Sequence, residues 1–434
     1  DPEIGATVRA YLERRGLAVE IIREFQLGLA PAGWENLVGK LRGRFTDEAL
    51  TEARLAGRRD VSGGRRGGLY DWFRNRLMVP LVAGGGTVVG FGARALQSGD
   101  EPKYLNSPES PVYHKGAFLF ALDAARRHLT PDGELIVVEG YFDVIALHQA
   151  GLRHTVATSG TALSADQARM LRRLVPRVAL TYDGDRAGRE AMMRSLSTLL
   201  AEGLDVAVVE LPEGDDPDTL VRRGGREAWD EARRHAADPA EFVQRHVLRA
   251  RSGDAPEGAR GDPREAAAQA IVRLACGIGD PIRLRLLIER ASQVLDLPEN
   301  VFSRALAVRR EGGATERPIR SAVRAGRQRE EAIERRLLQA LLLAPIELEA
   351  ARQHLSPEDF RDPVCVTLAL ALWGGATPEG EAAELARELA VSAGALDWAA
   401  EARGGVRRMT ERRLRRQLHE RRQQLHHAPP AEEA

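Results

Sequence analysis

The sequence predicts an α/β protein built around a Rossmann-like parallel sheet, with helical segments before and after it. Apolar strands alternate with helical segments over residues 133–225, short apolar runs surround glycine-rich turns over 60–94, and both flanks show helical periodicity. We therefore expect an N-terminal α/β subdomain, a parallel-sheet domain, a helical subdomain, a linker and an all-α C-terminal domain, at residues 1–120, 121–225, 226–312, 313–331 and 332–434.

The N-terminal segment is expected to begin with helices and then change to strands. Its helical patterns cover residues 1–17, 18–30, 33–43 and 46–57. In the last of these, Thr46 is the expected N-cap and Gly57 the expected end. The stretch that follows, RNRLMVPLVAGGGTVVGFGARAL, places apolar runs around a glycine turn and predicts a β-hairpin or meander.

The central segment carries the pattern of the parallel sheet. Its strands ELIVVE, HTVATS, RVALTYD and DVAVVELP are each followed by a helical segment. They are apolar on both faces, as strands are when helices cover both sides of a sheet. Ser164 and Gln167 have the spacing of a capping box at the start of the second helix.

The C-terminal third is expected to be helical on both sides of a linker. Residues 226–310 and 332–425 show helical patterns, whereas REGGATERPIRSAVRAGRQREE has linker composition. In the closing helix, residues 403–424 hold nine arginines against Glu411 and Glu420. This segment is either a solvated amphipathic helix with few acidic partners or a surface that docks on an acidic protein.

Composition describes an ordinary soluble globular protein. The 434 residues are 43% hydrophobic and 29% charged with formal net charge +0, so nucleic-acid affinity would have to come from local patches. The two cysteines, Cys276 and Cys365, lie in apolar helical segments and predict buried free thiols in a reducing compartment. Two cysteines also exclude a Cys-rich zinc ribbon in this chain. No apolar run is long enough for a membrane span, and the N-terminus has no signal-peptide pattern.

Carboxylates follow the ends of three of the predicted strands. Glu139 follows the first strand, Asp183 and Asp185 follow the third, and Asp216 and Asp218 follow the fourth. Ligands of such sheets bind at the carboxyl ends of the strands, so these side chains should converge. Converging carboxylates repel unless a cation neutralises them, and oxygen ligands select Mg²⁺ or Mn²⁺. We expect all five to be metal ligands and the first three to be the catalytic residues.

Such a site suits phosphoryl or nucleotidyl transfer, because the metal can bridge phosphate oxygens and stabilise developing charge. Gly184 would let the backbone of the DGD sequence turn tightly. Any one of these acids alone would be better explained as a helix N-terminal residue favoured by the helix dipole. That simpler explanation is preferred for Asp143 and Asp166.

Lysine is rare in the chain, and two of the three lysines lie in one short stretch. Only three of the 63 cationic residues are lysines, and Lys103 and Lys115 stand together in EPKYLNSPESPVYHKG. A compact ammonium on a flexible stem reaches a phosphate as a point charge, unlike the planar fork of arginine. Chance placement is the competing explanation. The stretch alone does not decide between the two.

The motifs together resemble a known family. VVEGYFDVIAL, TSGTALSADQARML, YDGDRAGREA and LPEGDDPDTLVRRGG resemble the Toprim module in order and spacing. Upstream, YDWFRNRLMVPL, GTVVGFGARAL and PKYLNSPESPVYHKG are similar to the RNA polymerase domain of bacterial DnaG-type DNA primases. The resemblance runs from about residue 1 to 310. It implies a basic ridge beside the metal site that binds template and nucleotide phosphates through Arg74, Arg76, Arg94, Lys103, Asn106 and Lys115, with Tyr104 stacking on a base or packing.

The resemblance implies a DNA primase, a nucleotidyltransferase that synthesises short RNA primers on single-stranded DNA with Mg²⁺ or Mn²⁺. Its expected partners are the template, ribonucleoside triphosphates and a hexameric replicative helicase bound through residues 332–434. We expect a cytoplasmic monomer acting at the nucleoid, without membrane contact. Zinc is expected only in the ribbon domain that normally precedes this region in the family, which is trimmed or lost here. The alternatives are a Toprim nuclease, which shares the metal chemistry, and a catalytically silent helicase-binding replication factor.

Overall fold

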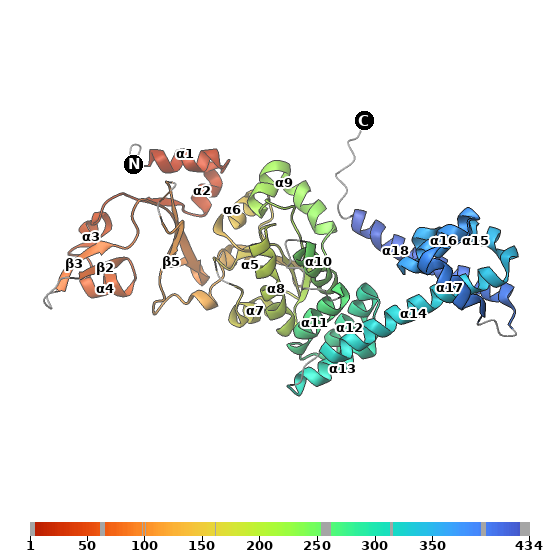
Figure 1. The fold of residues 1–434 in the computed structure, drawn as a ribbon. Helices are drawn as coiled ribbons and strands as arrows, with labels where there is room; N and C mark the ends of the chain where they lie inside the picture. Colours follow the sequence, from red (N-terminus) through yellow and green to blue (C-terminus); the bar gives the residue numbers. More distant parts are fainter. Residues whose placement is uncertain are drawn as a thin grey trace. The chain divides into compact units, whose positions relative to one another are not determined.

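The computed structural model describes residues 5–60, 66–97, 99, 101–160, 162–252, 262–312, 316–391 and 396–425. The chain divides into two compact units, Asp1–Gly313 and Ala314–Ala434, and each is described by itself (Figure 1). Among the described residues, no helix combines the length and the apolar character needed to cross a membrane.

The first unit begins with short helices and antiparallel strands. A four-stranded sheet has the order β1-β4-β5-β6, and β2 and β3 form a separate hairpin (Figure 1). The predicted hairpin at 60–94 is present as β4 and β5, which pair from Arg76↔Ala95 to Ala83↔Thr87. The elements are α1 (Ala6–Arg14), α2 (Val19–Glu24), β1 (Gly28–Ala30), α3 (Asn36–Leu41), α4 (Asp47–Glu52), β2 (Ala56–Asp60), β3 (Arg66–Asp71), β4 (Arg76–Ala83), β5 (Thr87–Ala95) and β6 (Tyr104–Asn106).

Two predicted helices end earlier than expected. The helix predicted over 18–30 stops at Glu24, because Gln26 adopts a left-handed φ of 51°, and β1 follows. The helix predicted over 46–57 begins at its expected N-cap, where Thr46 Oγ1 accepts a hydrogen bond from Ala49 N at 3.2 Å, but it ends at Glu52. Gly57 does not end this helix.

Gly57 lies instead in β2, directly opposite Tyr70 of β3. A Cβ atom at position 57 would lie 2.4 Å from the Tyr70 ring, so the glycine is required for the close approach of this side chain to the neighbouring strand. The sequence prediction mistook a packing glycine for a helix terminator.

The parallel sheet predicted for residues 133–225 is confirmed. Its four strands have the order β10-β9-β7-β8, and all neighbouring pairs are parallel. Helix α6 packs with α9, and α7 packs with α8 (Figure 1). The elements are α5 (Leu122–Arg126), β7 (Glu134–Val138), α6 (Tyr141–Gln149), β8 (Thr155–Ala157), α7 (Ala165–Arg172), β9 (Arg177–Leu180), α8 (Arg186–Ala201), β10 (Asp205–Val208) and α9 (Pro217–Arg234).

Local signals and burial explain these elements. The predicted capping box at α7 is present, since Ser164 Oγ accepts from Gln167 N at 3.1 Å and Gln167 Oε1 accepts from Ser164 N at 2.9 Å. One apolar core joins the parallel sheet to the N-terminal elements, with Leu12 of α1, Leu77 of β4 and Val138 of β7 all buried in it. The N-terminal subdomain is therefore fixed against the parallel sheet by shared packing.

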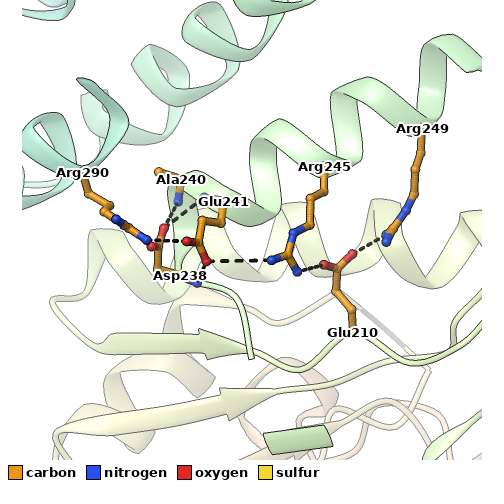
Figure 2. Close-up of polar contacts among 7 residues, drawn as sticks. All are labelled: Glu210, Asp238, Ala240, Glu241, Arg245, Arg249 and Arg290. Atoms are coloured by element: carbon orange, nitrogen blue, oxygen red, sulfur yellow. Dashed lines mark hydrogen bonds and ion pairs between the residues drawn. The ribbon is translucent and has the colours of Figure 1, made fainter. Parts of the chain in front are cut away.

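Four helices complete the first unit, and an ion-pair network joins one of them to the end of the sheet and a second one to the first. Glu210, just after β10, bonds to Arg245 at 3.0 Å and to Arg249, both from α10, while Arg290 of α12 bonds to Asp238 and Glu241 (Figure 2). The charges of Glu210 and Arg245 are nearly buried and mutually neutralised. The helices are α10 (Pro239–Ser252), α11 (Pro263–Cys276), α12 (Pro281–Leu295) and α13 (Glu299–Arg310).

The second unit is helical throughout its described residues. A buried core that includes Leu338, Cys365, Leu385 and Met409 joins its helices. The helices are α14 (Glu316–Leu343), α15 (Leu348–His354), α16 (Pro363–Gly374), α17 (Gly380–Val391) and α18 (Trp398–Leu425), with 3₁₀ turns η3 (Pro345–Glu347) and η4 (Pro357–Asp359). Both cysteines are free; Cys365 is buried as predicted, whereas Cys276 is only half-buried.

Two expectations for the C-terminal third need correction. The linker predicted at 313–331 is helical from Glu316 onward, because its arginine, glutamate and alanine residues favour helix and Ile319 and Val323, one turn apart, are buried. The arginines of α18 also have more acidic partners than the sequence indicated. Arg412 pairs with Glu334 at 2.8 Å and Arg413 with Asp359 at 3.2 Å.

Candidate active site

The predicted acidic residues lie on loops that leave one edge of the parallel sheet. Glu139 directly follows β7, the DGD sequence at 183–185 follows the adjacent strand β9, and residues 216–218 follow β10 and open α9. Gly184 N donates to Asp215 O at 2.9 Å, which ties the second loop to the third. The loops that carry the five acids therefore leave the same edge of the sheet, as the strand-end pattern predicted.

Glu139 lies in surroundings that disfavour its negative charge. Its Oε1 atom is buried without a hydrogen-bond partner in the structure. Burial raises the pKa of Glu139 to about 7, with further contributions from the charges of Asp183 and Asp185, while Arg194 opposes the shift. A carboxylate with an unpaired buried oxygen beside two other acids is a place where a cation would be stabilising.

Asp183 and Asp185 differ in their surroundings. Burial raises the pKa of Asp183, the charges of Asp216 and Asp185 raise it further, and Lys103 lowers it. Asp185 is exposed and is the N-cap of α8, accepting a hydrogen bond from Gly188 N at 2.7 Å. The first carboxylate is thus held inside the acidic group and the second at its solvent side.

The last two acids stand at the start of α9. Asp216 is its N-cap and accepts from Thr219 N at 2.6 Å. Asp218 is buried and pairs with Arg15 Nη1 at 2.5 Å. Burial raises the pKa of Asp218, although Arg15 lowers it. Arg15 was not predicted, because it lies 203 residues from its partner and only the folded chain brings the two together.

Asp143 is a further acid of this group that sequence reasoning assigned to a helix terminus. It does accept a hydrogen bond from Gly140 N at 3.0 Å at the start of α6. Its second oxygen accepts from Asp218 N at 3.4 Å, however, and the side chain is buried. Burial raises its pKa well above the usual value, and Asp183 and Asp216 add to the rise. Its position four residues after Glu139, one helical turn into α6, is the signal that could have identified it.

The acidic group suits a hard divalent cation by its chemistry. All of its ligand atoms are carboxylate oxygens, the donors that Mg²⁺ and Mn²⁺ prefer. The raised pKa values of Glu139, Asp143 and Asp183 and the unpartnered Oε1 of Glu139 indicate that positive charge would stabilise the group. Among the described residues, no three acidic, histidine or cysteine side chains already stand close enough to hold an ion together.

Two residues of the predicted basic ridge lie beside the acids. Lys103 is exposed and acts electrostatically on Asp183. Arg94 hydrogen-bonds to the Tyr104 hydroxyl and stacks over the Phe142 ring at 5.0 Å, and its charge acts on Asp218. Tyr104 is 42% exposed, and the cationic groups of Arg94 and Lys103 lie 5.1 and 5.9 Å from the centroid of its ring.

The other predicted residues make internal contacts. Asn106 donates to Ser159 O at 3.2 Å and accepts from the Tyr141 hydroxyl at 2.7 Å. Arg76 is buried and donates to Pro102 O at 2.6 Å. Lys115 begins the 3₁₀ turn η2 (Lys115–Ala117), and its backbone N donates to Glu109 at 2.8 Å. The first two residues thus support the structure of the ridge, whereas the half-buried side chain of Lys115 has no hydrogen bond or ion pair among the described residues.

Arg74 belongs to a second surface that sequence reasoning did not identify. Its guanidinium stacks over the Trp34 ring at 4.2 Å, and the Trp34 side chain is 57% exposed. A depression of about 600 Å³ lined by Trp34, Arg58, Arg59 and Tyr70 lies here. Exposed aromatic rings with arginines stacked on them are typical of surfaces that bind single-stranded nucleic acid.

The pKa of Glu139 predicts how stability depends on pH when no metal is bound. In the unfolded chain this carboxyl releases its proton near 4.5, but in the folded protein only near 7. Between these values the native state binds more protons, so its stability should fall as pH rises. After allowance for solvent screening, we expect the fall in the free energy of unfolding with rising pH to be smaller by about 1–2 kcal/mol in Glu139→Gln than in the unmodified chain. Thermal unfolding in EDTA at pH 5, 6, 7 and 8 measures it. Equal pH slopes for both proteins would contradict the expectation.

Two family models match the chain. One describes the DNA primase catalytic core, N-terminal domain, and matches residues 2–126; the other is described as Toprim-like and matches residues 136–221. Among curated proteins, the DNA primase of Salmonella typhimurium is 44% identical over 234 residues, and that of Pseudomonas aeruginosa is 47% identical over 222 residues. These matches cover 53% and 50% of this chain, but only 39% and 33% of the two relatives.

Solved structures cover the larger part of the chain. A DNA primase domain from Pseudomonas aeruginosa is 38% identical with a TM-score of 0.60, and the match covers 69% of this chain and 91% of that domain. A DnaG primase catalytic domain bound to single-stranded DNA is 35% identical with a TM-score of 0.57, covering 68% and 91%. The Aquifex aeolicus primase, solved with its zinc-binding and RNA polymerase domains, is 32% identical with a TM-score of 0.57, covering 68% of each chain.

Proposed function

This chain belongs to the DnaG-type DNA primase family, and from that premise we propose that it is a template-directed RNA polymerase that makes short RNA primers on single-stranded DNA. The reaction would be nucleotidyl transfer from a ribonucleoside triphosphate. The observation that carries the proposal is the meeting of an acidic edge and a cationic edge, with Lys103 and Arg94 acting on Asp183 and Asp218.

The acidic residues would bind and orient the phosphates through Mg²⁺ or Mn²⁺. A bound ion would supply Lewis-acid stabilisation of the charge that develops on the phosphate oxygens. Glu139, Asp183 and Asp185 would be the catalytic ligands, with Asp216 and Asp218 completing the set. Asp143 would help to position this group, because its carboxylate oxygens accept hydrogen bonds from the backbone amides of Gly140 and Asp218.

The cationic edge would hold the triphosphate and the template. The exposed ammonium of Lys103 suits a phosphate contact, and the exposed part of the Tyr104 ring suits a base. Lys115 would add a second ammonium, while Asn106 and Arg76 keep this edge in shape. At the separate surface around Trp34 and Arg74, template bases would stack.

Membership of the family supports further proposals about the partner protein and the cellular location. We propose that residues 332–434 bind a hexameric replicative helicase, and that the chain acts at the replication fork in the cytoplasm as a monomer when free. A Toprim nuclease would use the same acids, but the neighbouring phosphate-binding cations and the family favour synthesis.

A primer-extension assay tests the activity. The purified protein is incubated with single-stranded DNA, labelled ribonucleotides and Mg²⁺ or Mn²⁺, with a pre-annealed short RNA primer in a parallel tube, and the products are separated on a sequencing gel. We expect metal-dependent addition of ribonucleotides that requires the template. Shortened DNA would favour the nuclease instead. An unchanged gel together with tight binding to the helicase would leave only a binding role.

A further inference from the structure

A second cavity lies between the parallel-sheet domain and the helical subdomain. Its volume is about 440 Å³, and it is lined by residues of α8, α10 and α11. Three of these residues carry nitrogen cations or can do so: Arg194 of α8, His246 of α10 and Arg273 of α11. We call this cavity the α8–α11 groove.

The side chains of the groove arginines have no ion pair or hydrogen bond within the described part of the chain. Arg194 and Arg273 are both exposed residues. Partial burial lowers the pKa of Arg273, and the nearby charge of Arg309 lowers it further. By contrast, Arg245 and Arg249 of the same subdomain are both bound to Glu210 (Figure 2). The groove therefore concentrates unpaired positive charge, which an anionic ligand would stabilise.

Among the described residues, Glu190 is the one acid that lines the groove, and it already has a partner. Glu190 pairs with Arg186 at 3.0 Å on the surface of α8. It therefore compensates the groove arginines only in part. An anion entering between Arg194 and Arg273 would meet two donors and little repulsion.

The remaining walls are apolar and fit a flat organic group. Met193 lines the cavity from α8, and Val247 lines it from α10. The His246 ring packs against the buried Phe242 ring with centroids 5.9 Å apart, which holds the imidazole at the wall. A ligand with an anionic end and an apolar ring would satisfy both parts of the groove, and a cavity of a few hundred Å³ matches ligands of that size.

We propose that the α8–α11 groove binds a free nucleotide, with Arg194 and Arg273 contacting its phosphates and the apolar wall beside His246 contacting its base. This site is separate from the metal-binding edge, since none of its lining residues belongs to the acidic group. Arg194 nevertheless acts electrostatically on Glu139, and its charge lowers the pKa of that acid. A nucleotide in the groove would engage Arg194 and so change the environment of the active site.

Calorimetric titration of the full chain with ATP in EDTA tests the proposal. EDTA removes divalent cations, so binding that depends on the acidic edge is suppressed. We expect one ATP to bind, and Arg273→Glu to weaken this binding about tenfold or more, since it replaces a phosphate-binding charge by a repelling one. Its matched control is Arg304→Glu, an exposed arginine of α13 outside the groove, for which we expect a change of no more than about twofold.

Other outcomes would overturn the proposal. The Arg273→Glu side chain would lie beside Arg309, so we expect no loss of thermal stability, and the unfolding temperature is measured alongside. Absence of ATP binding, or equal weakening by both charge reversals, would exclude the site. ATP binding that is insensitive to Arg273→Glu but lost with Lys103→Glu would place the nucleotide on the basic ridge. A parallel titration with an eight-nucleotide oligo(dT) distinguishes a strand from a free nucleotide: if Arg273→Glu weakens only the oligonucleotide, the groove binds a strand and the proposal fails.

Discussion

Replacing Asp183 and Asp185 together by asparagine is expected to lower ribonucleotide addition by roughly 10³-fold without unfolding the protein. Asparagine keeps the shape of both side chains but removes the charge that would hold a divalent cation. Asp183 lies within the acidic group: the charges of Asp216 and Asp185 raise its pKa, and its own charge raises that of Glu139. Removing two negative charges also relieves this repulsion, so the metal-free variant should be at least as stable as the unmodified chain.

The choice of asparagine matters at Asp185. This residue caps α8 through the hydrogen bond from Gly188 N, and asparagine is an equally good N-cap, whereas alanine would cost about 1 kcal/mol. Asp166→Asn is the matched control, because this acid is exposed, pairs with Arg169 and stands outside the acidic group. Primer extension and thermal unfolding are measured for both. Undiminished extension by the double variant would remove these residues from the active site.

The sequence was sufficient to predict the parallel sheet and its acidic edge for a specific physical reason. A strand covered on both faces is apolar at every position, so the first polar residue marks the strand end. Glu139 follows Val138 in this way, and the turn to a helix places the side chain at the edge of the sheet. Capping residues are equally local, which is why Ser164 and Thr46 were identified correctly.

The remainder of the site depends on contacts between distant parts of the chain. Arg15 meets Asp218 only because α1 and α9 share one core. Trp34 lies between β1 and α3, and Arg74 lies between β3 and β4. Neither segment by itself indicates that the guanidinium stacks over the ring. Local composition also misled at Gly57, where the glycine serves the Tyr70 ring of a neighbouring strand. Motif and periodicity describe neighbours in sequence, and these features are neighbours only in space.

Gly184→Ala is the second substitution with a large expected effect. A Cβ atom at this position would lie 2.1 Å from Pro212 O and 3.0 Å from Leu211 O, both of which are backbone atoms that cannot rotate away. Its amide also bonds to Asp215 O at 2.9 Å, so the methyl group would push apart the two loops that carry the acids. We expect a loss of about 1–3 kcal/mol in stability from overpacking. A displacement of about 1 Å between the acids should lower primer extension roughly 10²-fold.

Gly279→Ala is the matched control, since a Cβ atom at that position meets no atom within 4 Å. The control should leave both thermal stability and primer extension close to those of the unmodified chain. Comparison with the asparagine double variant then separates two requirements of the acidic edge. The asparagines remove charge and keep geometry, whereas Gly184→Ala keeps every charge and alters geometry. If Gly184→Ala extends primers as well as the unmodified chain does, close approach of the two loops is not needed, and the charges alone would account for the activity.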